Sequence, residues 1–203
     1  MDSSWKFVIG FVLLFVVVFG TTYVSIQLDK NEQESYTYNG FEFRQAPSGS
    51  DTLWVTQIEV QGQPYNIPFY HHPSATEDIA YTEGLAEAIT DAEIPPEMVY
   101  LSLSPDAGSR PVIAAVEISR LLGTRYNLLN MEVQSALTRP DDSLDTLVRT
   151  CEDARDGVLV IVFEQGTINA ITNDGNCITM TYTTPEESIR VADRFAYELL
   201  KIM

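Results

Sequence analysis

The residues of this chain best suited to binding a ligand lie in the stretch 104–110, which reads SPDAGSR. It follows a predicted strand and leads into a predicted helix, a junction where α/β proteins commonly bind ligands because free backbone N–H groups and the helix dipole attract anions. Asp106, Gly108, Ser109 and Arg110 are therefore candidate ligand-binding residues. The stretch matches neither of the glycine-rich phosphate-binding motifs, and the same residue types serve in any turn that caps a helix. Both interpretations stay open.

The other residues that could carry chemistry favour no reaction. The two histidines, His71 and His72, are adjacent, and adjacent side chains of a strand point to opposite faces, so they are poor joint ligands for one metal ion. Paired carboxylates occur at residues 141–142, 152–153 and 186–187, as chance predicts in a chain with 29 acidic residues. Neither G-x-S-x-G nor H-E-x-x-H occurs. We expect no catalytic residue, no metal and no cofactor, and we favour a function other than catalysis.

The chain has two cysteines, Cys151 and Cys177. If the domain lies outside the cytoplasm, a disulfide between them would close a loop of about 27 residues and stabilise the fold by roughly 3–3.5 kcal/mol in the entropic model. Cys177 opens a predicted strand, and neighbouring strands of one sheet could bring the two residues together. Two separate thiols are the alternative, whereas a redox role is disfavoured because there is no C-x-x-C motif.

The local patterns predict the elements that would position these residues. Period-2 alternation over residues 36–73, with an Asn-Gly turn at 39–40, predicts a small antiparallel β meander. Further strands are expected at 98–104, 130–138 and 158–165, and as a hairpin around the N-D-G-N turn at 173–176. Helices are expected at 74–92, at 111–123 and from Thr184 to the end of the chain. These elements predict an α/β domain with a mixed sheet and about three helices, with α+β as the alternative.

A long apolar segment precedes this domain. Residues 7–26 contain no charge, and about 20 helical residues span the roughly 30 Å of a bilayer core. We therefore predict a single-pass transmembrane anchor at 1–28 that contacts membrane lipid, a charged linker at 29–35 and an acidic domain at 36–203. A cleaved signal peptide and a filament-forming helix of the pilin kind are the alternatives.

Charge limits the partners of the domain. The formal net charge is −17, from 12 basic and 29 acidic residues. A field of that sign repels phosphate backbones, so we expect no nucleic acid partner. Basic residues near the span give only a faint orientation signal, but the short N-terminal flank and the position of both cysteines favour an extracellular C-terminal domain.

Three stretches carry a resemblance to known sequences. They are residues 99–123 (VYLSLSPDAGSRPVIAAVEISRLLG), 174–182 (DGNCITMTY) and 192–203 (ADRFAYELLKIM). They resemble uncharacterised single-pass membrane proteins of archaea, particularly of lineages with small genomes. The resemblance covers most of the chain after the linker, and it implies an envelope-facing domain and a pairing of Cys151 with Cys177. It implies no activity.

Three functions follow as expectations. The first is a membrane-anchored envelope or surface protein with a non-enzymatic binding or assembly role toward other surface proteins. The second is an anchored enzyme or small-ligand domain that uses the loop at 104–111. The third is a pilin-like filament subunit. A cleft at the loop, with Asp106 and Arg110 converging on it, would favour the second, and an exposed apolar patch or strand edge near Trp54 would favour the first.

Overall fold

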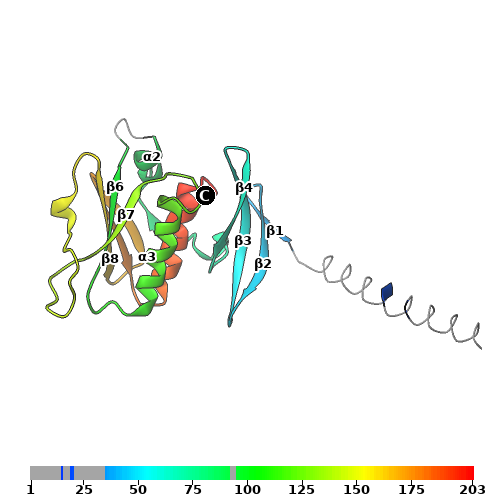
Figure 1. Ribbon diagram of the computed structural model, residues 1–203, viewed down its shortest axis with the longest axis horizontal. Helices are drawn as coiled ribbons and strands as arrows, with labels where there is room; N and C mark the ends of the chain where they lie inside the picture. Colours follow the sequence, from blue (N-terminus) through cyan, green and yellow to red (C-terminus); the bar gives the residue numbers. More distant parts are fainter. Residues whose placement is uncertain (1–14, 16–18, 21–34, 92–94) are drawn as a thin grey trace, which may run out of the picture. The chain divides into compact units, whose positions relative to one another are not determined.

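The computed structural model describes residues 15, 19–20, 35–91 and 95–203 (Figure 1). The chain divides into two compact units, Met1–Tyr36 and Thr37–Met203. The predicted anchor and the predicted linker fall almost entirely outside the described residues, as does the continuous helix that a pilin-like subunit would need. In the part of the chain that the structure describes, no helix is both long enough and apolar enough to cross a membrane.

The first sheet is an antiparallel meander of four consecutive strands. They are β1 (Ser35–Tyr38), β2 (Phe41–Ser48), β3 (Asp51–Val60) and β4 (Gln63–Phe69), in the order β1-β2-β3-β4. Asn39 and Gly40 have φ angles of 46° and 85°, and positive values at both central residues produce the turn that matches the twist of a hairpin. The meander prediction is confirmed. Strand β4 is an edge strand and contains Pro64 and Pro68, which have no N–H to donate to a further strand.

The second sheet is mixed and has six strands. They are β5 (Ala80–Tyr81), β6 (Met98–Leu103), β7 (Glu132–Leu137), β8 (Val158–Gln165), β9 (Ala170–Asp174) and β10 (Cys177–Tyr182). The order is β5-β9-β10-β8-β6-β7. Strands β10, β8, β6 and β7 are parallel neighbours, and β9 pairs antiparallel with β10. The central strand β8 is buried on both faces, as its run of six apolar residues predicts.

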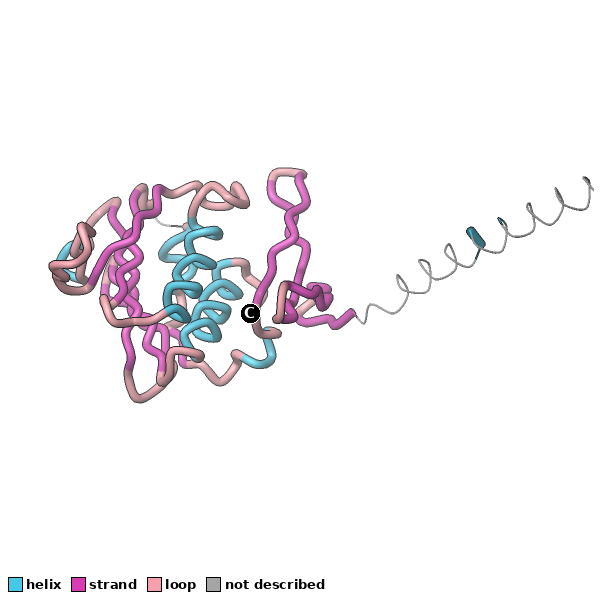
Figure 2. The backbone as a smooth tube through the Cα atoms, turned by 60° about the horizontal axis from the view of Figure 1, so that its bottom comes forward, coloured by secondary structure: helices cyan, strands magenta, loops and turns pink. Residues whose placement is uncertain are grey.

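The described helices are α2 (Leu85–Thr90), α3 (Ser109–Leu122) and α4 (Glu187–Leu199). In both views α3 and α4 lie between the two sheets, so that the domain has a sheet, a helical layer and a second sheet (Figure 1, Figure 2). Tyr197 packs helix α4 against the meander, because its ring centroid lies 4.3 Å from that of Phe69 on β4 and 6.0 Å from that of Phe43 on β2. The predicted α/β fold with a meander, a mixed sheet and three helices is confirmed among the described residues.

The opposite face of the six-stranded sheet is covered in part by the chain between β7 and β8. We call residues 138–157 the covering connection (yellow in Figure 1). It contains one short 3-10 helix, η2 (Cys151–Asp153). Beneath it lies a small apolar cluster, separate from the main core, that is formed by Val160, Val162 and Cys177 with Tyr100 and Ala154 packed against them.

Two helix predictions need correction. The helix expected at 74–92 is instead a 3-10 turn, η1 (Pro73–Ala75), then strand β5, then α2. Ala80 pairs with Ala170 of β9, so tertiary strand pairing prevails over the helical periodicity, and Gly84 with φ of 79° prevents a helix from passing through it. The last helix begins at Glu187 rather than near Thr184, whose side chain is not its cap.

Candidate ligand-binding site

The carboxyl ends of four parallel strands meet at one edge of the six-stranded sheet. These ends are Leu103, Leu137, Gln165 and Tyr182. From β6 the chain runs through α3 to β7, the neighbour of β6 on one side. It then returns to β8, the neighbour of β6 on the other side. The strand order therefore reverses between β6 and β8. In open α/β sheets, ligands bind in the crevice outside the carboxyl ends of strands at such a reversal.

A cavity of about 690 Å³ lies at this place, and we call it the edge cavity. Its polar lining comes from the ends of β6, β7 and β8 and from the covering connection. The polar side chains concerned are Ser104, Asp106, Thr138, Thr150, Glu152, Glu164 and Gln165. Because they come from separate elements, they surround the cavity rather than follow one strand. Within the part of the chain that the structure describes, no Lys or Arg side chain lines it.

The apolar part of the lining includes Val162, Phe163, Tyr182 and Pro185. Tyr182 is only 3% exposed, and among the described residues its hydroxyl has no hydrogen-bond partner. Burial raises the pKa of Tyr182, and the nearby carboxylate of Glu164 raises it further, so this phenol stays protonated. A buried phenol that lines a cavity without a protein partner is a group to which a ligand can hydrogen-bond.

Backbone contacts hold the covering connection against the sheet. The amide of Leu137 donates to the carbonyl of Leu147 at 2.8 Å, and the amide of Arg149 donates to the carbonyl of Leu137 at 2.9 Å. The buried hydroxyl of Ser102 donates to the carbonyl of Arg149 at 2.5 Å. The guanidinium of Arg149 lies 4.9 Å from the ring centroid of Tyr100. One wall of the edge cavity is thus attached to β6 and β7.

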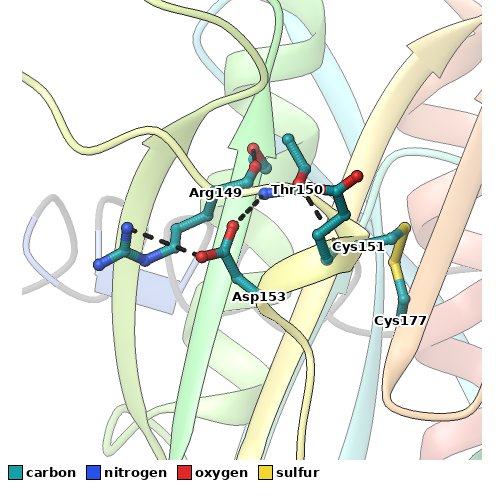
Figure 3. Close-up of a disulfide and its surroundings, with 7 residues drawn as sticks. Arg149, Thr150, Cys151, Asp153 and Cys177 are labelled. Carbon is teal, nitrogen blue, oxygen red and sulfur yellow. Dashed lines mark hydrogen bonds and ion pairs between the residues drawn. A yellow bond between two sulfur atoms is a disulfide. The ribbon is translucent and has the colours of Figure 1, made fainter.

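A disulfide attaches the same wall to β10. Cys151 of η2 is bonded to Cys177, the first residue of β10, with an S–S length of 2.02 Å (Figure 3). Next to it, the side chain of Asp153 accepts a hydrogen bond of 2.8 Å from the amide of Thr150, which closes the turn. The predicted disulfide is therefore confirmed, and Cys151 itself lines the edge cavity.

The sequence-predicted loop residues divide into two groups. Asp106 lines the edge cavity, whereas Gly108, Ser109 and Arg110 are not among the lining residues. Gly108 precedes α3 with φ of 77° and ψ of −173°, a conformation open essentially only to glycine, and Ser109 and Arg110 form the first turn of that helix. A cavity does lie at this loop, but Asp106 forms its ion pair with Arg139 and not with Arg110.

The two histidines have separate structural partners. The Nδ1 atom of His71 lies 2.8 Å from a carboxylate oxygen of Asp193, and the ring of His72 lies 4.8 Å from that of Trp54, centroid to centroid. Among the residues that the structure describes, no group of three or more His, Cys, Asp or Glu side chains is arranged to hold a metal ion.

Sequence reasoning missed several residues of the edge cavity, namely Thr138, Thr150, Glu152, Glu164 and Tyr182. Glu164 directly follows the apolar run of β8, and Tyr182 ends β10. Their positions at strand ends would have indicated a shared site only if β8 and β10 had been assigned as parallel neighbours. Glu152 belongs to an acidic pair, and in a chain with 29 acidic residues such a pair gave no reason to single it out.

A second cavity, of about 430 Å³, lies beside α2 and is lined by Tyr81, Glu83, Glu87, Arg194 and Glu198 among others. Arg194 and Glu198 form an ion pair of 2.5 Å there. Burial raises the pKa of Glu198, with the Arg194 guanidinium acting in the opposite direction. This cavity is smaller and lies away from the carboxyl ends of the parallel strands, so the edge cavity is the stronger candidate.

Comparisons with protein-family models, with curated proteins and with solved structures found no match to this chain.

Proposed function

We propose that this chain is a membrane-anchored, outward-facing, non-enzymatic binding protein whose ligand occupies the edge cavity. The observation that carries the proposal is the position of the cavity: it lies at the reversal of strand order, where α/β sheets bind ligands. Polar side chains from several elements surround an apolar part that includes Phe163 and Tyr182, a composition typical of small-molecule sites.

An outward-facing domain is supported by the disulfide. Disulfides persist in oxidising compartments and are rare in the cytosol. The charge-free segment 7–26 supplies the anchor. A membrane-impermeant thiol reagent applied to intact cells tests the orientation. We expect labelling of Cys151 and Cys177 only after reduction. Labelling that needs cell lysis but no reduction would refute an outward-facing domain.

An assembly role through a surface near Trp54 has less support. Trp54 lies on β3, an inner strand of the meander, and its ring packs at an angle of 63° against that of His72. An inner strand offers no backbone groups to a further strand, so β-strand addition to a partner cannot occur at Trp54. The edge cavity therefore provides the stronger reason for a function.

Ligand binding is tested on the full chain in lipid nanodiscs by saturation-transfer NMR. The probes are 2-phenylethylamine, 2-phenylethanol and phenylacetate, which share a phenyl group and differ in charge. Ala107 lines the edge cavity, so Ala107→Trp fills it, while Val112→Trp adds the same ring at a side chain that is 50% exposed on α3. We expect transfer to at least one probe, lost in Ala107→Trp and kept in Val112→Trp.

The melting temperature and the disulfide of each variant show whether it folds. If no probe of any charge receives saturation from the wild-type chain, or if a folded Ala107→Trp variant behaves as the wild type does, the edge cavity is not a small-molecule site.

A further inference from the structure

We infer that the ligand of the edge cavity is an organic cation that carries an apolar group; this inference rests on the proposed function and specifies its ligand. It follows from the charges around the cavity together with the unpartnered hydroxyl of Tyr182.

Three carboxylates line the edge cavity, and they come from three separate elements. Asp106 follows β6, Glu152 lies in η2, and Glu164 is near the end of β8. Asp106 is paired with Arg139, but Glu152 and Glu164 form no ion pair within the described part of the chain. Two lining carboxylates without an ion pair repel an anion and attract a cation in the cavity.

An anionic ligand would need a source of positive charge, and the lining has none. The N-terminal turn of α3, with Ser109 and Arg110, is not part of the cavity lining. Arg149 is directed to the ring of Tyr100 and lies 3.9 Å from Asp153. The anion site predicted from the sequence at 104–110 stays a prediction, and the edge cavity beside it favours a ligand of the opposite charge.

The remaining lining specifies the rest of the ligand. Phe163 and Tyr182 offer aromatic surface, and Val162 and Pro185 offer aliphatic surface. Tyr182 is 3% exposed and lines the cavity, and its hydroxyl, which has no hydrogen-bond partner among the described residues, can accept a hydrogen bond from an ammonium or guanidinium group. An organic cation with an apolar body satisfies the carboxylates, the hydroxyl and the apolar surface together, whereas a hydrated metal ion would leave the apolar surface uncovered.

Calorimetric titration of the full chain in nanodiscs tests the charge preference with the same three probes. We expect 2-phenylethylamine to bind about tenfold or more tightly than 2-phenylethanol, which in turn binds more tightly than phenylacetate. The affinity for the amine should fall as salt is added, whereas the affinity for the alcohol should not. N-Acetyl-lysine methylamide serves as a fourth probe, because its preference over 2-phenylethylamine would indicate a peptide side chain as the source of the cation.

A matched pair of double variants separates local from global charge. Glu152→Gln with Glu164→Gln removes two carboxylates from the edge cavity, and Glu42→Gln with Glu59→Gln removes two exposed carboxylates from the meander. Only the first pair should weaken binding of the amine, by about tenfold, and it should leave binding of the alcohol within about twofold.

The outcomes distinguish the two proposals. If the alcohol or phenylacetate binds as tightly as the amine, and this binding is lost in Ala107→Trp, the cation inference is overturned and the binding function stands. Equal loss of amine affinity in both double variants would also overturn the inference, because the effect would then come from net charge. If none of the probes binds, the proposed function fails together with its ligand.

Discussion

The carboxylate of Asp193 accepts two hydrogen bonds of 2.8 Å from His71, one from the backbone amide and one from the Nδ1 atom of the ring. Asp193 lies on α4 and is 3% exposed, and His71 follows β4 of the meander. The hydroxyl of Tyr197 donates to the carbonyl of His71 at 2.5 Å. These three bonds attach the chain that leaves the meander to the helix that contacts both sheets.

The stability of the domain should depend on the ionisation of Asp193. Burial raises the pKa of Asp193 to about 6 from its ordinary value of 3.8, although the hydrogen bonds from His71 oppose the shift. A raised pKa means that the folded protein binds the proton more tightly than the unfolded chain does. The stabilisation from protonation is therefore complete below pH 3.8 and is lost as the pH rises through about 6.

Asp193→Asn should remove this dependence while keeping an oxygen that can accept from His71. Between pH 4 and pH 7, the wild type should lose up to about 3 kcal/mol of unfolding free energy relative to the variant. Urea denaturation across this range provides the measurement. Asp174→Asn, at an exposed carboxylate beside the β9–β10 turn, is the control. A constant difference between wild type and Asp193→Asn from pH 4 to pH 7 would contradict the assignment.

The disulfide should contribute a large share of the stability of the domain. Cys151 and Cys177 are 26 residues apart, and closing a loop of that length in the unfolded chain stabilises the fold by about 3.5 kcal/mol in the entropic model. We expect a dithiol reductant to lower the urea midpoint of the wild type. The double variant Cys151→Ser with Cys177→Ser should show the lower midpoint with or without reductant. A midpoint that reduction does not move would mean that the covering connection holds without the bond.

Arg190 should matter more for stability than other arginines of the surface. Its guanidinium bonds both carboxylate oxygens of Asp78, at 2.6 and 2.8 Å, and also Glu187 and the carbonyl of Ala75. It therefore attaches α4 to the segment around η1. Arg190→Met keeps the apolar part of the side chain and should cost about 2 kcal/mol.

Arg120 provides the matched control. It also forms an ion pair, in which one guanidinium nitrogen donates to both carboxylate oxygens of Glu117 in the same helix, but its side chain is 43% exposed. Arg120→Met should cost under about 1 kcal/mol, as exposed pairs do. Equal costs for the two variants in urea denaturation would show that the contacts of Arg190 outside its own helix add nothing.

Local patterns predict those parts of the fold that depend on neighbouring residues in the chain. The Asn39-Gly40 turn, the alternation along β3 and the hairpin before Cys177 are all local signals, and the structure agrees with each. The helix expected at 74–92 failed because a non-local pairing, that of Ala80 with Ala170, outweighs the helical pattern. The sequence contains no signal for that pairing.

The same distinction explains what could be predicted of the candidate site. Asp106 was identified because its loop joins a strand and a helix that are adjacent in sequence. Glu164 and Tyr182 were missed because they approach only through the parallel pairing of β8 with β10, and Glu152 because the disulfide and the covering connection bring it to the cavity. Residues that are distant in sequence meet at such a site through the sheet order, which periodicity does not specify.

The hydroxyl of Ser102 should control how firmly the covering connection is held. Ser102 is fully buried on β6 and donates to the carbonyl of Arg149. Ser102→Ala leaves that carbonyl without this donor, which should cost about 1–2 kcal/mol. Because the amide of Arg149 bonds to Leu137 next to the lost contact, we expect this amide to exchange its hydrogen at least several times faster in the variant.

Ser135→Ala is the matched control, because Ser135 lies on the neighbouring strand β7 with an exposed side chain. It should leave the exchange rate of the Arg149 amide unchanged. If Ser102→Ala also leaves that rate unchanged, the disulfide and the backbone contacts at Leu137 hold the wall of the edge cavity without help from β6. If the rate rises in Ser102→Ala alone, this wall is attached to the sheet at three places, and the shape of the cavity depends on each of them.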